Sequence, residues 1–255
     1  MHDYHQYFCT DDSLGLPDNQ ITHLLRDSKN RFWVGTVNGV CLYTDKDNFR
    51  IIPIEADNKN VRQILEDRNG RIFLNTGFQL YAYHPREEKI TCVLPEISPG
   101  NAFYAQCHIA PDNNLWVMTS TGLRCYDPST LQLKESVALN GYPYYSYLHN
   151  NELWITGNHT LSIFDTRTRS FKPLPQPIAQ NTTLCNADID YIHPYGNNGL
   201  LLNTARHGMF YYNPGTGSVT RQDENGFPFE MPRFRISRMF TDSQQNLWIG
   251  SVDQG

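Results

Sequence analysis

The sequence predicts an all-β protein, a β-propeller made of four-stranded antiparallel blades. A four-residue strand pattern recurs six times along the chain, as WVGT (33–36), FLNT (73–76), WVMT (116–119), WITG (154–157), LLNT (201–204) and WIGS (248–251). A second pattern, an aromatic residue followed by a turn, keeps step with the first in five of these repeats. The chain is also rich in Phe (13), Tyr (15), Gly (17) and Pro (15), which disfavours long helices and suits short strands with tight turns. A regular spacing of this length is typical of propellers and solenoids.

The first repeat shows its four strands most clearly. The alternation of apolar residues predicts strands at Ile21 to Arg26, Phe32 to Thr36, Val40 to Tyr43 and Phe49 to Ile54. The short segments between them are rich in Asp, Asn, Gly and Ser, which form turns. Each repeat is therefore expected to be a four-stranded meander that stacks face to face on the next repeat.

The recurring Trp is expected to pack between blades. An alternative is that these Trp rings form a row of surfaces on which sugars stack. However, Phe73 and Leu201 occupy the same position of the repeat, which we call the Trp station, and they offer no indole. Asp27, Asp67 and Asp242 each precede the station by six residues, and we expect them to form turns.

We expect one partial propeller over residues 1–255. Its predicted parts are an N-terminal strand of a closing blade at 1–15, five full blades at 16–54, 57–95, 99–136, 141–175 and 185–222, and a truncated blade at 231–255. Five blades, half of a sixth and one strand suggest a seven-bladed ring that is incomplete. Uncovered blade faces next to repeats one and six are expected to lower stability and to promote association.

The segment from Gly15 through Asp27 to Val40 resembles the two-component regulator propeller repeat. Repeats two and six carry the same phrase, whereas repeats four and five keep only the two patterns. The resemblance implies the periplasmic sensor domain of a hybrid two-component histidine kinase. It implies an oligosaccharide ligand, signal transduction to genes of polysaccharide utilisation, and partners among the remaining blades and receptor domains, including a receptor dimer. The sequence itself contains no signal segment, membrane span, kinase or response regulator.

Composition and motifs argue against several other functions. The formal net charge is −5 with scattered Lys and Arg, so we expect no nucleic-acid partner. The six cysteines are expected to be buried thiols rather than disulfides or metal ligands. The nine histidines are dispersed, and no hydrolase, metalloprotease or nucleotide-binding motif occurs. We therefore expect no metal, no cofactor and no catalytic residue, although Asp188 and Asp190 could form a carboxylate pair.

In a propeller, the loops between strands two and three of each blade and the loops between blades gather on one face. The predicted ligand-binding residues lie in these loops and in the segments 140–145 and 181–190. They are Asn38, Gln79, Tyr142, Tyr144, His159, Arg206, His207, Arg233 and Arg235. Aromatic rings with Arg, Asn and His suit a sugar with acidic substituents. For Tyr142 and Tyr144 the alternative is that they only begin a strand of blade four.

Three functions remain open at this point. The leading one is a sensory interaction module with no enzymatic activity of its own. The second is an enzyme on the same architecture that resembles the streptogramin lyases, and the third is a scaffold that binds protein. Because one fold hosts many functions, the architecture alone does not choose among them.

Overall fold

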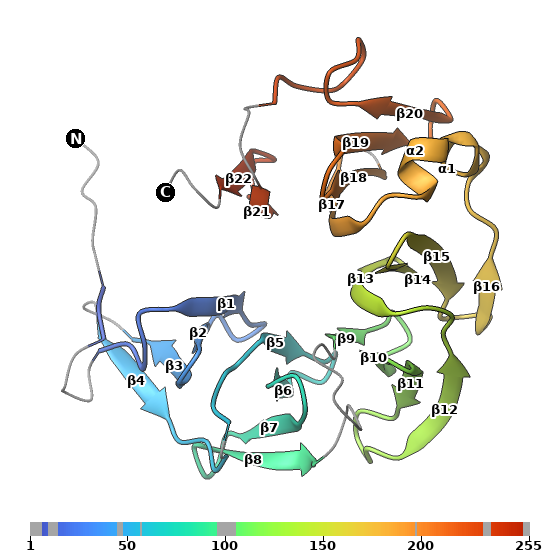
Figure 1. The fold of residues 1–255 in the computed structure, drawn as a ribbon. Coiled ribbons are helices and arrows are strands. Elements are labelled where there is room, and N and C mark those ends of the chain that lie inside the picture. Colours follow the sequence, from blue (N-terminus) through green and yellow to red (C-terminus); the bar gives the residue numbers. More distant parts are fainter. Residues whose placement is uncertain are drawn as a thin grey trace, which may run out of the picture. The chain divides into compact units, whose positions relative to one another are not determined.

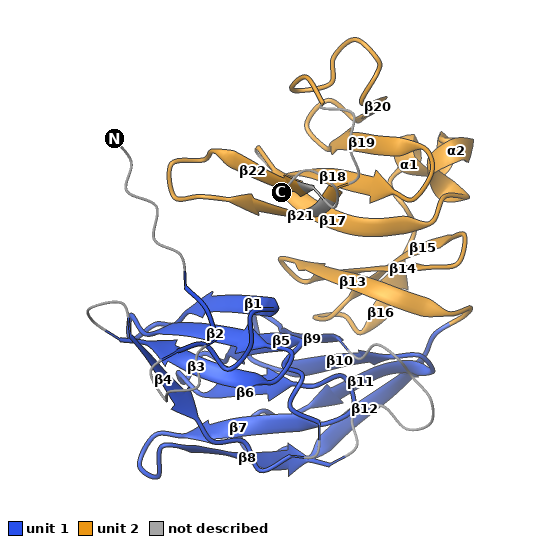
Figure 2. Ribbon diagram, turned by 60° about the vertical axis from the view of Figure 1, so that its left-hand side comes forward, with its two compact units in different colours: residues 1–139 blue, residues 140–255 orange. Residues whose placement is uncertain are grey.

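The computed structural model describes residues 7–9, 15–44, 48–56, 58–95, 106–196, 198–231 and 236–251. Over these residues the protein is all-β, with five four-stranded antiparallel sheets and one two-stranded sheet (Figure 1). Each sheet follows the order of its strands in the chain, as the predicted meander requires. The chain divides into two compact units, Met1–Leu139 and Asn140–Gly255 (Figure 2).

The first unit holds blades one to three. Blade one consists of β1 (Ile21–Arg26), β2 (Phe32–Thr36), β3 (Gly39–Tyr43) and β4 (Phe49–Ile52). Blade two consists of β5 (Gln63–Glu66), β6 (Ile72–Asn75), β7 (Leu80–His84) and β8 (Lys89–Leu94). Blade three consists of β9 (Gln106–Ile109), β10 (Leu115–Thr119), β11 (Gly122–Tyr126) and β12 (Leu133–Ala138).

The second unit holds blades four and five and the half-blade six. Blade four consists of β13 (Pro143–His149), β14 (Glu152–Gly157), β15 (Thr160–Asp165) and β16 (Ser170–Lys172). Two short helices follow it, α1 (Gln176–Gln180) and α2 (Thr182–Cys185). Blade five consists of β17 (Ile189–Tyr195), β18 (Gly199–Thr204), β19 (Gly208–Asn213) and β20 (Ser218–Arg221), and half-blade six consists of β21 (Ile236–Thr241) and β22 (Leu247–Ser251).

The cores lie between consecutive blades, as the repeat predicts. Trp33 of blade one is fully buried in a cluster with Ile64 and Tyr83 of blade two, and Trp154 of blade four packs with Ile192 of blade five. The interpretation of the Trp station as packing is confirmed at these positions. Trp248, in half-blade six, is instead 62% exposed.

Side chains from the first strand of one blade also donate hydrogen bonds to the backbone of the next first strand. Tyr145 of β13 donates its hydroxyl to the Ile192 carbonyl at 3.3 Å, and Tyr191 of β17 does the same to the Met239 carbonyl at 3.2 Å. In the first unit, Gln63 of β5 both donates its side-chain amide to the carbonyl of Cys107 (3.1 Å) and accepts from the N–H of that residue (2.9 Å). Blades two and three, four and five, and five and six are thus joined along their first strands by hydrogen bonds as well as by apolar packing.

The recurring Asp is a turn-former and also a partner of the Trp. In the β1–β2 hairpin, Asp27 accepts hydrogen bonds from the backbone of Lys29 and Arg31 and from the Trp33 indole at 2.8 Å. Half-blade six repeats this arrangement, since the Trp248 indole donates to Asp242 at 2.9 Å. The predicted turn role is confirmed. The indole bond also links the turn to the Trp side chain of the next strand.

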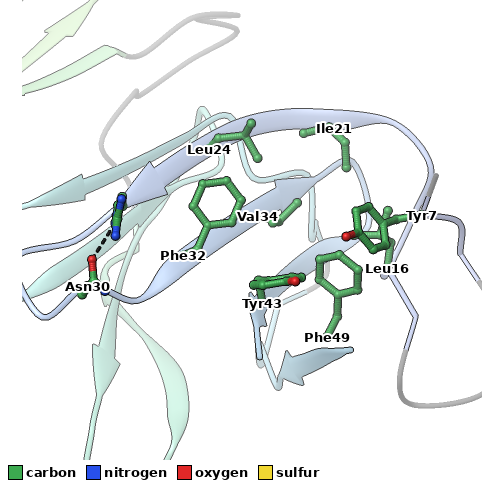
Figure 3. A pocket seen from close by; sticks show the side chains of 10 residues that line it. Tyr7, Leu16, Ile21, Leu24, Asn30, Phe32, Val34, Tyr43 and Phe49 are labelled. Atoms are coloured by element: carbon green, nitrogen blue, oxygen red, sulfur yellow. Dashed lines mark hydrogen bonds between the residues drawn. The ribbon is translucent and has the colours of Figure 1, made fainter. Parts of the chain in front are cut away.

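The outer face of blade one is apolar and open. Ile21, Leu24 and Phe32 are between 37% and 54% exposed, and they line a hollow of about 660 Å³ with Tyr43 and Phe49 (Figure 3). In half-blade six, Phe240 is 63% exposed beside Trp248 (62%). Both blades that were expected to carry uncovered faces therefore expose apolar side chains.

Two segments add to the sequence-based expectations. Residues 176–185, which lie between the predicted blades four and five, form α1 and α2, and Ile178 and Leu184 are fully buried in the core between these blades. Residues 7–9 of the predicted closing strand are irregular, and Tyr7 packs on Phe49 of blade one at 5.2 Å between ring centroids. The closing role of residues 1–15 and the total number of blades stay predictions. No described helix is long and apolar enough to cross a membrane.

Candidate functional site

A polar cluster surrounds Asp188 in the second unit, where the β14–β15 turn meets the segment that leads into β17. The backbone N–H of His159 donates to the Asp188 carboxylate at 3.0 Å, and its ring Nδ1 lies 3.5 Å from the same oxygen. Nδ1 also lies 2.9 Å from the carbonyl oxygen of Asn186. Because a carbonyl only accepts, Nδ1 carries the proton and the Nε2 of the neutral ring is an acceptor. The His159 side chain is 71% exposed, so the cluster presents this acceptor to solvent.

The backbone of His159 supports the same geometry. Its φ is +51°, in the left-handed region that residues other than Gly adopt infrequently. The two hydrogen bonds to Asp188 and Asn186 hold the residue in this conformation. A held, outward-facing histidine at a turn is an observation from which a functional role can be argued.

Tyr144 lies beside the cluster with a buried hydroxyl. Burial of this hydroxyl, together with the nearby carboxylates of Asp188 and Asp190, raises the pKa of Tyr144 to about 12. The phenol therefore keeps its proton at neutral pH. The two carboxylates considered from the sequence thus both act electrostatically on one tyrosine.

The β18–β19 turn lies next to this cluster. The backbone N–H of Ala205 donates to the Asp188 carbonyl at 2.9 Å, and the N–H of His207 donates to the Thr204 hydroxyl at 2.9 Å. Arg206 and His207 are exposed on this turn. Tyr142, which is 75% exposed, lies just before β13. The described part of the second unit therefore contains five of the nine predicted residues, and the structure ties two of their segments to Asp188.

Of the four remaining predicted residues, two are described and two are not. Asn38 and Gln79 lie in the first unit, on the β2–β3 and β6–β7 turns. Gln79 accepts a hydrogen bond from the Tyr81 hydroxyl at 2.6 Å and lines a separate hollow of about 420 Å³. Arg233 and Arg235 lie outside the described residues.

The sequence did not single out Asn186, and it gave the whole segment 181–190 one role. The structure divides this segment. Asn181 caps α2 by accepting from the N–H of Leu184 at 2.9 Å, and Leu184 is fully buried, so the first half is structural. The Asn-Thr-Thr sequence at 181–183 is the signal that would have indicated a helix start. Only the second half, from Asn186 onward, contributes to the cluster.

Cysteine and metal chemistry do not enter the cluster. All six cysteines are free, and burial raises the pKa of Cys41 and of Cys107 to about 12. The expectation that every thiol is buried is wrong for Cys9 and Cys92, which are exposed, and Cys185 is only half-buried. Cys92 lies on β8, an edge strand of its sheet. Among the described residues, no three His, Cys, Asp or Glu side chains come together as a metal site would require.

The arrangement can recognise hydroxyl groups and can also move a proton. His159 Nε2 accepts a hydrogen bond, and the exposed Tyr142 ring offers a flat surface for the apolar face of a sugar. A neutral histidine whose ring N–H is held by an acceptor, here the Asn186 carbonyl, is also a usual general base. The local geometry therefore fits either saccharide binding or acid–base catalysis.

Known proteins that share the fold of this chain differ in function. The family model described as "Two component regulator propeller" matches residues 15–38. No curated protein sequence matches the chain. Among solved structures, the extracellular domain of a hybrid two component system from B. thetaiotaomicron is similar, with 18% identity and a TM-score of 0.60 over 97% of this chain and 39% of that one. A second such domain from the same organism has 16% identity and a TM-score of 0.56, over 91% of this chain and 39% of that one.

A lyase shares the fold as well. Virginiamycin B lyase from Staphylococcus aureus is similar with 15% identity and a TM-score of 0.68, over 92% of this chain and 78% of that one. The chain spans about two fifths of the length of the two receptor domains. At these identities the likeness shows the fold, and the resemblance that the sequence suggested is confirmed by the match at residues 15–38. The chain therefore carries a two component regulator propeller repeat, on a β-propeller fold that it shares with extracellular domains of hybrid two component systems.

Proposed function

We propose that this chain is part of the sensory region of a periplasmic receptor of the hybrid two-component type. The observation that carries the proposal is the regulator propeller repeat at residues 15–38, in a chain whose fold matches two extracellular domains of such systems over more than nine tenths of its length. Its role is to bind and to report, and the kinase that it regulates belongs to other parts of the receptor. The partners are the other blades and domains of that receptor, including a second receptor copy.

The ligand in this proposal is an oligosaccharide, and the Asp188 cluster is its binding site. His159 Nε2 accepts from a sugar hydroxyl, and Tyr142 covers an apolar ring face. Arg206 and His207 on the adjacent turn contact a neighbouring sugar unit. Removing one uncharged hydrogen bond to the ligand costs about 1 kcal/mol of binding free energy, which lowers the affinity roughly fivefold.

A thermal-shift screen of oligosaccharides tests the proposal. A true ligand stabilises the folded state by mass action, so we expect a rise in melting temperature that saturates with concentration. His159→Asn tolerates the left-handed backbone and retains the N–H to Asp188, and we expect it to weaken binding about fivefold. The control is His84→Asn in the first unit, whose ring bonds Thr91 at 2.7 Å, and it should bind as the wild type does. If no saccharide raises the melting temperature, the proposed ligand class is wrong.

A second candidate is an enzyme of the lyase kind, which one feature of the cluster favours. One structure of virginiamycin B lyase is a catalytically inactive variant in which a histidine is replaced by alanine, in complex with quinupristin. That lyase depends on a histidine, and His159 here is exposed, with its backbone N–H bonded to Asp188 and its ring Nδ1 to the Asn186 carbonyl. Incubation of the protein with quinupristin, followed by mass spectrometry, discriminates between the two functions. Turnover that His159→Asn abolishes would support the enzyme, and intact quinupristin would support the sensor.

A further inference from the structure

A second hollow opens at the opposite end of β14 from the Asp188 cluster. It has a volume of about 480 Å³ and lies between blades four and five, within the second unit. The lining is mainly polar and includes the side chains His149, Asn150, Asn151, Glu152, Trp154, Asp165, Arg167, Lys172, Asn198 and Tyr212. A volume of this size is usual for small-molecule sites.

The β13–β14 hairpin beside the hollow has a shorter turn than the Trp-bearing hairpins of blade one and half-blade six. In β1–β2, Arg26 pairs with Phe32 and five residues lie between them, among them the Asp that accepts from the Trp indole. In β13–β14, His149 pairs with Glu152, so only Asn150 and Asn151 form the turn. The Asp and its carboxylate are absent from this hairpin, and the space beside the turn is part of the hollow.

The Trp154 indole is left without its usual acceptor. The indoles of Trp33 and Trp248 donate to an Asp at 2.8 and 2.9 Å at the turn end of their sheets. Trp154 stands at the same station, lines the hollow and is only 2% exposed, yet its Nε1 has no hydrogen-bond partner among the described residues. A buried donor without an acceptor costs free energy, so it is rare unless a ligand or water serves it.

The charges of the hollow indicate what kind of ligand would fit. Glu152 is paired with Lys172 at 2.5 Å, and the Asp165 carboxylate accepts the backbone N–H groups of Arg167 and Thr168 at 2.9 Å each. Both acidic side chains are therefore already engaged. The Arg167 guanidinium is exposed at the rim and matches a carboxylate in a bidentate manner.

The remaining lining suits hydroxyl groups on a ring. Three asparagine amides at the two hairpin turns, those of Asn150, Asn151 and Asn198, can each donate and accept. The Tyr212 ring packs on Trp154 with 6.2 Å between centroids and forms an aromatic wall. Apolar ring faces of sugars pack on such walls while their hydroxyls meet the polar groups.

We propose that this hollow is a second ligand site, which takes a saccharide unit bearing a carboxylate. The carboxylate binds Arg167, ring hydroxyls meet the asparagine amides, and one ligand oxygen accepts from the Trp154 indole. The site lies at the other strand ends from the Asp188 cluster and does not depend on the function proposed there.

Indole signals in the ¹H–¹⁵N NMR spectrum of the whole chain test the site directly. The four Trp residues give four indole signals, and Trp154→Phe identifies the signal of interest. On titration with D-galacturonic acid, we expect a saturable shift of the Trp154 signal, with the signals of Trp33 and Trp248 unmoved. Galactose, which lacks the carboxylate, should bind at least about fivefold more weakly.

Variants on one turn supply the control. Arg167→Gln should weaken galacturonic acid binding about fivefold or more, whereas Arg169→Gln, two residues away and outside the lining, should titrate as the wild type does. His159→Asn should leave the Trp154 titration unchanged, which separates this site from the Asp188 cluster. A Trp154 signal that does not move at concentrations on the order of 50 mM, or an Arg167→Gln titration equal to that of the wild type, would overturn the proposal.

Discussion

Replacing Asp27 by alanine should destabilise the protein much more than the same change at Asp67. Both carboxylates accept two backbone N–H groups of their hairpin turns, at 2.8–3.0 Å. Asp27 also accepts from the Trp33 indole, whereas blade two has Phe73 at that station and the second carboxylate oxygen of Asp67 has no partner among the described residues. The pair of variants therefore isolates the indole bond.

The expected difference follows from the energy of that bond. A buried hydrogen bond to a charged group contributes about 1.5–3 kcal/mol. The ion pair of Asp27 with Arg31 adds little, because Arg31 is partly exposed and solvent screens it. We expect Asp27→Ala to lose about 2 kcal/mol more free energy of unfolding than Asp67→Ala, or roughly 4–8 °C in melting temperature.

Urea unfolding followed by circular dichroism at pH 7 measures both losses on the whole chain. Trp33→Phe should cost about 2 kcal/mol in the wild type and clearly less in the Asp27→Ala background, which is the coupling that a double-mutant cycle reports. Equal losses for the two aspartate variants, within about 0.5 kcal/mol, would refute the reasoning.

The same carboxylate predicts a pH effect. Burial raises the pKa of Asp27, but the hydrogen bonds from Trp33 and Arg31 outweigh it and hold the pKa below its usual 3.8. A lowered folded-state pKa contributes stability that is complete above 3.8 and is lost as the pH falls through the folded value. Wild-type stability should therefore fall more steeply below pH 4 than that of Asp27→Ala, as acid titrations at fixed urea would reveal.

Three further predictions concern other parts of the fold. Burial lowers the pKa of His108 from 6.5 to about 4, so up to roughly 3 kcal/mol of stability is present above pH 6.5 and is lost as the pH falls from 6.5 to 4. In His108→Gln, the free energy of unfolding measured in urea should depend less on pH over that range. An unchanged pH dependence would contradict this. The double change Leu24→Lys and Phe32→Lys should reduce self-association in sedimentation velocity by charging the open face of blade one, and undiminished association would exclude that face. A methyl group on Gly122 would lie 2.4 Å from the Val137 carbonyl oxygen, so Gly122→Ala should cost about 1–3 kcal/mol, while Gly215→Ala at a looser turn should cost less than half as much in the same urea assay.

The sequence predicted the blades well because each blade is a local structure. In the first repeat the observed strands differ from the predicted ones by at most two residues, at the start of β3 and the end of β4. Period-two alternation and turn residues determine such hairpins without reference to the rest of the chain. The helices α1 and α2 were missed because they are short and are stabilised by burial of Ile178 and Leu184 against another blade.

The candidate site was only partly predictable, since it depends on contacts between turns. Propeller topology indicated the β14–β15 turn and its His159 as candidates, and their role in binding stays a prediction. The bond to Asp188, 29 residues further along the chain, depends on how blade five approaches blade four. The hollow near Trp154 was not predicted, because the feature that marks it is a turn that lacks the Asp of other repeats. In a sequence, such a shortened turn looks like ordinary variation in loop length.

The bonds that join successive first strands have main-chain carbonyls as their acceptors, at Cys107, Ile192 and Met239. A carbonyl is present whatever amino acid occupies the position, so a substitution on the accepting strand leaves the acceptor in place. Only the donor has to be retained, and amide and phenol groups both serve. Neighbouring repeats are thereby free to diverge in composition, as the fourth and fifth have from the first, without losing the link that keeps them in register.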